Sequence, residues 1–98
     1  MNENEFQSKV IKEIKKIFPK SIVIKTDPGY LQGVPDLLVL LDNTWFALEV
    51  KKNATAKHRP NQDYYVSLMN RMSWARFVHP ENFKEVVNEL ARAFGVKI

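Results

Sequence analysis

The chain has 98 residues, no cysteine, and 15 lysines and arginines against 11 aspartates and glutamates. This length suits one domain over residues 1–98, and the absence of cysteine excludes disulfides, zinc–thiolate sites and cysteine nucleophiles. The N-terminus has neither the basic start nor the apolar run of a signal peptide, and no stretch approaches the roughly 20 apolar residues of a membrane span. We therefore expect a soluble, cytoplasmic protein with no membrane partner.

Hydrophobic spacing predicts helices alternating with strands along the chain. Apolar residues at helical spacing indicate a first helix that Pro19 ends, and the apolar run 37–41 is typical of a strand buried on both faces. The expected elements are, in chain order, a helix over 3–18, strands over 21–25, 37–41 and 44–50, a helix over 60–72, a strand over 74–78 and a closing helix carrying Phe83, Val86, Val87, Leu90 and Phe94. The first strands form a meander and the last arrives through a helical crossover. This order predicts an α+β (mixed α/β) fold with helices packed on a mixed sheet.

The connections between these elements carry their own signals. Pro28 and Gly29 suit the central positions of a type II turn over residues 27–30. Residues 42–43 form a tight connection, and Pro60 suits the first position of the second helix.

The hairpin formed by the second and third strands places ionisable side chains together. If residues 42–43 are a two-residue loop, Asp36 stands directly opposite Glu49, and a four-residue loop keeps that register. Opposed side chains have Cβ atoms roughly 4.5–5.5 Å apart, so two carboxylates in apolar surroundings would repel one another unless a divalent cation lay between them. Lys51 lies two residues beyond Glu49 and projects from the same face. This pattern predicts a metal pair and an ammonium group in one pocket.

The helices offer two further candidates. On a helical wheel Glu3 lies in the middle of the apolar stripe, with Phe6 and Val10, whereas Glu5 points the opposite way. A glutamate on the core face at a helix end is oddly placed unless it meets a cation or a buried donor; fraying of the helix end is the alternative. Gln62 shares the inward face of the second helix.

These residues carry a resemblance to a known family. Gly33-Val34-Pro35-Asp36, Leu48-Glu49-Val50-Lys51 and Arg59-Pro60-Asn61-Gln62, in this order, resemble the motifs of the PD-(D/E)xK nuclease superfamily. Within it, the chain looks most like stand-alone VRR-NUC domains of viruses and bacteria, over about residues 3–87. The resemblance implies a restriction-endonuclease-like αβββαβ(α) core, and the host cytoplasm as the location if the chain is viral.

The resemblance also assigns roles by position. Asp36, Glu49 and the backbone carbonyl of Val50 match the family's metal ligands, and Lys51 matches the lysine that positions or activates the attacking water. Gln62 matches a glutamine that supports the site. Glu3 matches the family's first-helix glutamate, although Glu5 and Gln7 remain open, as does the number of metal ions.

The implied activity is Mg²⁺-dependent or Mn²⁺-dependent hydrolysis of DNA phosphodiester bonds by an endonuclease. Stand-alone relatives typically form homodimers, which would suit a branched substrate such as a four-way (Holliday) junction. One alternative is a module that binds nucleic acid without cleaving it. Another is an interaction protein whose basic surface contacts an acidic partner, since the net charge of +4 fits either polyanion.

Overall fold

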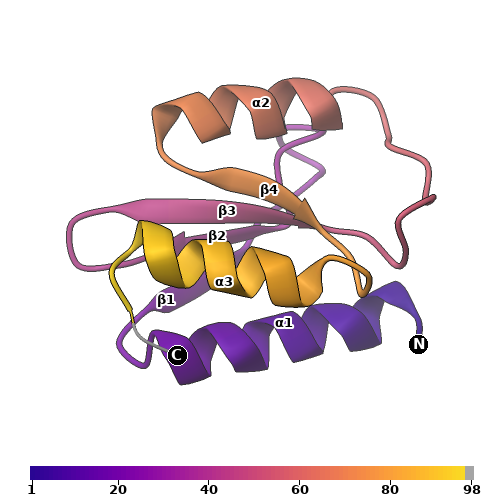
Figure 1. The fold of residues 1–98 in the computed structure, drawn as a ribbon. Helices are drawn as coiled ribbons and strands as arrows, with labels where there is room; N and C mark the ends of the chain where they lie inside the picture. Colours follow the sequence, from indigo (N-terminus) through magenta and orange to yellow (C-terminus); the bar gives the residue numbers. More distant parts are fainter. Residues whose placement is uncertain (97–98) are drawn as a thin grey trace.

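The computed structural model describes residues 1–96, which form three helices and four strands (Figure 1). The elements are α1 (Glu3–Ile17), β1 (Ile22–Lys25), β2 (Leu37–Leu40), β3 (Trp45–Val50), α2 (Gln62–Met72), β4 (Ala75–Val78) and α3 (Phe83–Ala93). This is the predicted order, and the α+β expectation is confirmed. None of the helices in the described part of the chain is long and apolar enough to cross a membrane.

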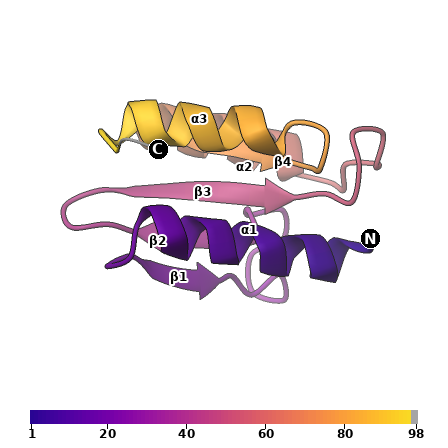
Figure 2. The same ribbon diagram turned by 60° about the horizontal axis from the view of Figure 1, so that its bottom comes forward.

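The four strands form one mixed sheet in the order β1-β2-β3-β4. β1 pairs with β2 and β2 with β3 in antiparallel fashion, whereas β3 and β4 run parallel. A parallel neighbour needs a crossover connection, and α2 supplies it. Helices α1 and α3 cover one face of the sheet and α2 the other (Figures 1 and 2).

The main core lies between the sheet and helices α1 and α3. Alternation along β3 sends Phe46, Leu48 and Val50 into this core. Ala47 points to the opposite face and joins a smaller cluster under α2. Glu49 and Lys51 continue that second alternation, so the sheet turns both charged side chains toward α2.

The hairpin has the predicted register. Leu37 pairs with Leu48, and Leu40 pairs with Trp45. The Leu41 amide closes the loop by donating to the Thr44 carbonyl across 2.9 Å. Continuing the ladder by one step sets Asp36 opposite Glu49, as the two-residue loop predicts.

Two local predictions are wrong. A turn does form over residues 27–30, where the Tyr30 amide donates to the Asp27 carbonyl across 3.3 Å. It is not type II, because that turn needs a positive φ at Gly29, and only Gly33 and Gly95 among the glycines have one. The second helix begins at Gln62 rather than at Pro60, because Asn61 takes a left-handed conformation with φ of 70° and interrupts the helical path.

Candidate active site

An open pocket of about 730 Å³ lies at the end of the sheet where β3 runs into the following loop. Three segments supply its walls: the loop between β1 and β2, the end of β3, and the loop that leads to α2. The N-terminal end of α1 lies at the same end of the sheet in both views (Figures 1 and 2). The pocket is lined, among others, by Glu3, Asp36, Glu49, Lys51 and Gln62. These five candidates, predicted from separate parts of the sequence, therefore meet in one place, whereas Val50 is not among the lining residues.

Asp36 is tied to the strand opposite. Its Oδ2 accepts a 2.8 Å hydrogen bond from the Val50 amide, which joins the start of β2 to the end of β3. The Thr26 amide donates to the Asp36 carbonyl across 2.9 Å and so holds its backbone from the other side. The carboxylate is thereby fixed beside Glu49 by backbone contacts from two strands.

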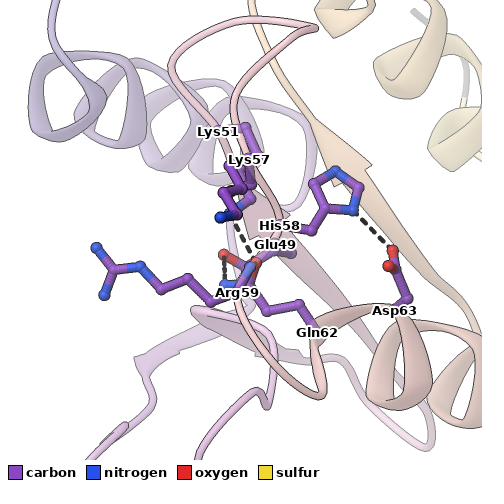
Figure 3. Close-up of polar contacts among 7 residues, drawn as sticks. All are labelled: Glu49, Lys51, Lys57, His58, Arg59, Gln62 and Asp63. Atoms are coloured by element: carbon purple, nitrogen blue, oxygen red, sulfur yellow. Dashed lines mark hydrogen bonds and ion pairs between the residues drawn. The ribbon is translucent and has the colours of Figure 1, made fainter.

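Glu49 and Lys51 are buried charged residues, with exposed fractions of 2% and 6%. Lys51 donates from Nζ to Gln62 Oε1 at 2.6 Å and to the Lys57 carbonyl at 3.2 Å. Gln62 in turn donates from Nε2 to Glu49 Oε2 at 3.1 Å (Figure 3). Gln62 is itself only 8% exposed, which confirms that it points inward. One amide side chain thus links the carboxylate to the ammonium group.

The environment of Glu49 disfavours its charge. Burial raises the pKa of Glu49 from its ordinary 4.5 to about 9, and the neighbouring Asp36 carboxylate adds to the rise. The positive charge of Lys51 lowers this pKa, and Glu3 raises it slightly. The ionised form of Glu49 is therefore unfavourable unless a further positive charge compensates for burial and for Asp36.

The donor set fits a divalent cation. Among the described residues, Glu49 Oε1 is a buried oxygen with no hydrogen-bond partner, although buried polar atoms normally have one. Carboxylate and backbone carbonyl oxygens are the ligands that hard cations prefer, and Asp36 and Val50 bring both types beside Glu49. A cation would also remove the repulsion between the two carboxylates.

Glu3 lies on the rim rather than beside the carboxylate pair. It is exposed, and within residues 1–96 no three acidic, histidine or cysteine side chains gather closely enough to hold a metal ion. The reason is architectural: α1 packs on one face of the sheet and Glu49 points to the other, so Glu3 approaches only around the end. Its role as a ligand stays a prediction. Glu5 instead caps α1, because its side chain accepts from the Asn2 amide at 3.1 Å.

Sequence reasoning missed a side-chain contact beside the pocket. His58 Nδ1 lies 2.7 Å from Asp63 Oδ1, and the His58 ring stacks on Phe77 with centroids 4.0 Å apart. His58 is exposed, but these contacts hold its ring in place (Figure 3). The sequence also did not predict that the backbone amide of Arg59 donates a hydrogen bond to Gln62 Oε1, at 2.8 Å. No residue pattern signals a backbone contact of this kind.

Comparison with known proteins supports this architecture. No family model matches the chain, and no curated protein does either. A solved structure described as a VRR_NUC domain superposes with a TM-score of 0.63 and 29% sequence identity, covering 89% of this chain and 95% of that one. The chain has the fold of a VRR_NUC domain. The resemblance predicted from the motifs is therefore confirmed at the level of fold and overall sequence similarity.

The VRR_NUC match gives the pocket its context. Because it covers 89% of this chain and 95% of that one, the likeness extends over most of the domain rather than over one shared motif. The site residues themselves rest on the geometry described above. A nuclease-type fold now surrounds the carboxylate pair, the buried lysine and the glutamine between them.

Proposed function

We propose that this chain is a divalent-metal-dependent endonuclease that hydrolyses phosphodiester bonds in DNA. The observation that carries the proposal is the pairing of Glu49, buried with an unpartnered oxygen, with Lys51 two residues away in one open pocket. A buried acid and a buried lysine are a costly way to stabilise so small a domain. The VRR_NUC fold supports reading them as reaction machinery.

Asp36 and Glu49 would hold Mg²⁺ or Mn²⁺, with the Val50 carbonyl as a further ligand and Glu3 reaching in from the rim. The bound ion would polarise the phosphate and lower the pKa of a water molecule. Whether one ion or two bind depends on residues such as Glu3 and Gln7. Gln7 is half-buried on α1 and is not among the residues that line the pocket.

Lys51 would act on the reacting groups directly. Its two hydrogen bonds, to Gln62 and to the Lys57 carbonyl, fix Nζ in the pocket. A fixed ammonium group can orient the attacking water or stabilise negative charge that develops on the phosphate. Gln62 is then a positioning residue, because it holds both Lys51 and Glu49 and needs no contact with substrate.

The rim suits a polyanionic substrate. Lys52, Lys57 and Arg59 line the pocket and are exposed, and lysine and arginine contacts to phosphate supply most non-specific affinity for DNA. Such contacts carry little sequence information. We therefore propose selection by DNA structure, as in a branched or four-way-junction substrate, rather than by base sequence.

A homodimer would place two such pockets on one branched molecule. β1 is an edge strand, and its Ile22 and Ile24 are 60% and 40% exposed. Exposed apolar side chains on an unpaired strand edge favour pairing with another chain. The occupant we propose is a second copy of this chain, because the same edge would then be satisfied on both subunits by a twofold axis.

The deciding experiment uses branched, flapped and linear DNA with Mg²⁺, Mn²⁺ or EDTA. Lys51→Ala is compared with Lys84→Ala, which removes the same charge from an exposed position on α3, outside the pocket. We expect metal-dependent cleavage that falls by about 100-fold or more in Lys51→Ala and changes little in Lys84→Ala. Binding without cleavage would instead support the non-cleaving module, and neither binding nor cleavage would leave an interaction protein. Equal cleavage by wild type and Lys51→Ala would show that the site is wrong.

A further inference from the structure

The loop between β1 and β2 forms one wall of the pocket and exposes its tip. Pro28, Gln32, Gly33 and Val34 line the pocket. Tyr30, between them in the chain, is 90% exposed, and the adjacent Leu31 is 44% exposed. Tyr30 is the most exposed of the large hydrophobic side chains in the described part of the chain. An apolar pair is therefore exposed to solvent on the loop that forms one wall of the proposed cleavage site, although neither residue is among those that line the pocket.

The base of this loop is held by hydrogen bonds. Thr26 Oγ1 donates to the Pro35 carbonyl across 2.7 Å, and the Thr26 amide donates to the Asp36 carbonyl across 2.9 Å. These two contacts join the entry and the exit of the loop directly beside Asp36. The position of the tip is thus coupled to the position of the carboxylate.

The two sides of the tip are also fixed. On one side, Asp27 Oδ1 accepts from the Gly29 amide at 2.8 Å. On the other, Gly33 has φ of 95° and packs so closely that a Cβ there would lie 2.6 Å from Asn61 Cβ. The loop is therefore braced against the start of α2, and Tyr30 is displayed on a supported backbone.

An exposed aromatic ring on a fixed loop is suited to stacking on a flat, apolar partner. Tyrosine offers a large contact area with few rotatable bonds, so its ordering on binding is inexpensive. Next to a pocket with a basic rim, the partner that combines negative charge with flat apolar faces is a nucleic acid. In a fully paired duplex the faces of the bases are covered by their neighbours, so the ring can reach only a base that is unpaired or unstacked.

We infer that Tyr30, with Leu31 beside it, stacks on an unpaired or splayed base of DNA next to the phosphate held in the pocket. This inference rests on the proposed nuclease function and specifies its substrate class: DNA with a base released from the stack, as at a branch point or a flap. The loop then contributes to substrate choice by contact with a base face and without reading a base edge.

The experiment measures binding in EDTA, where no cleavage occurs, and follows the fluorescence of 2-aminopurine at the branch position of a flapped DNA. The variants are Tyr30→Phe, which keeps the ring, and Tyr30→Ala, which removes it. Tyr64→Ala is the matched control, because Tyr64 is also exposed, at 61%, but lies on α2 rather than on the loop that forms a wall of the pocket. A fully paired duplex of the same length reports affinity that does not depend on an unpaired base.

Wild type, Tyr30→Phe and Tyr64→Ala should quench the 2-aminopurine and bind the flapped DNA alike. Tyr30→Ala should lose the quenching and bind flapped DNA roughly tenfold more weakly, a change of about 1.4 kcal/mol, with duplex affinity unchanged. Equal binding and quenching by Tyr30→Ala would overturn the inference. So would a Tyr30→Ala variant that still quenches but has lost self-association, because the tip would then be a protein contact.

The two proposals fail separately. If wild type cleaves with Mg²⁺ while Tyr30→Ala binds and quenches as wild type does, the stacking inference falls and the nuclease stands. If wild type binds and quenches but no metal supports cleavage, the nuclease falls and the stacking stands. If wild type does not bind flapped DNA at all, both fall.

Discussion

Gln62 Oε1 accepts a 2.6 Å hydrogen bond from Lys51 Nζ, across the gap between α2 and the end of β3. The same amide group donates from Nε2 to Glu49 at 3.1 Å. An amide is suited to this place because it accepts on one atom and donates on the other. A glutamate at position 62 could not donate to Glu49, and a lysine could not accept from Lys51.

Gln62→Ala should therefore reduce both stability and activity. It leaves the buried Glu49 and Lys51 side chains without their shared hydrogen-bond partner. This loss should lower the free energy of unfolding by about 1–3 kcal/mol. Urea unfolding measures the loss, and Gln32→Ala is the control because Gln32 is exposed. If the two variants unfold at the same urea concentration, Gln62 contributes no structural hydrogen bonding of consequence.

The raised pKa of Glu49 predicts a pH dependence of stability in the absence of metal. The native state keeps a proton on Glu49 up to a pKa of about 9, whereas the unfolded chain releases it near 4.5. The native state thus binds more protons between these values, and its stability falls as pH rises through the window, by up to about 1.4 kcal/mol per pH unit.

Glu49→Gln removes this titration with little change in shape. Urea unfolding in EDTA at about pH 5, 7 and 9 should show wild type losing stability relative to Glu49→Gln as the pH rises. Parallel pH profiles for the two proteins would mean that Glu49 ionises in the folded state as it does in the unfolded chain.

Divalent cations should stabilise the folded protein. An ion that binds the carboxylate pair only in the native state raises its stability, by about 2.7 kcal/mol when the free ion is 100-fold above its dissociation constant. Thermal unfolding near neutral pH should show a higher Tm with Mn²⁺ or Mg²⁺ for wild type and no rise for Glu49→Gln. Glu85→Gln, an exposed change on α3, should respond as wild type does. A Glu49→Gln variant with an undiminished rise would place the ion elsewhere.

Gly33 should tolerate no side chain. Alanine there would combine an unfavourable φ of 95° with a Cβ only 2.6 Å from Asn61 Cβ. We expect Gly33→Ala to destabilise the fold by more than about 2 kcal/mol, and the displaced start of α2 should carry Gln62 out of place. Gly95→Ala separates the two causes, because Gly95 also has a positive φ, 72°, but no atom within 4 Å of its Cβ. Equal losses in the two variants would mean that the contact with Asn61 is soft.

Self-association through β1 is open to a direct test. Ile24→Lys adds charge to the exposed edge strand and should shift sedimentation from dimer to monomer. Met72→Lys is the control, because Met72 is 68% exposed and lies at the end of α2. A dimer that persists in Ile24→Lys would show that another surface joins the subunits.

The positions of the hairpin motifs could be predicted from the sequence, because the length of the connecting loop fixes which residues pair across the two strands. A two-residue connection after β2 sets Asp36 against Glu49, and alternation turns Lys51 to the same side. The inward face of Gln62 likewise followed from helical spacing, which depends only on local geometry. The family resemblance came separately, from the motifs that contain these residues.

Turn types and helix starts were less predictable. Pro60 fits the first position of a helix, yet Asn61 adopts a left-handed conformation against Gly33, a residue nearly 30 positions earlier. α2 begins directly after this close approach. No local preference at Pro60 could reveal it, because the cause lies in another loop.

Glu3 shows most clearly which features follow from the local sequence and which depend on tertiary contacts. The wheel puts it on the face of α1 that packs inward, and Phe6 and Val10 on that face are buried. Only the tertiary structure decides that α1 lies on the opposite side of the sheet from Glu49, so that Glu3 reaches the pocket at its rim. By itself the sequence determined which residues share a strand or helix face, because periodicity is local. Which faces meet around the pocket was decided by the packing of the helices on the sheet, because that depends on contacts between distant segments.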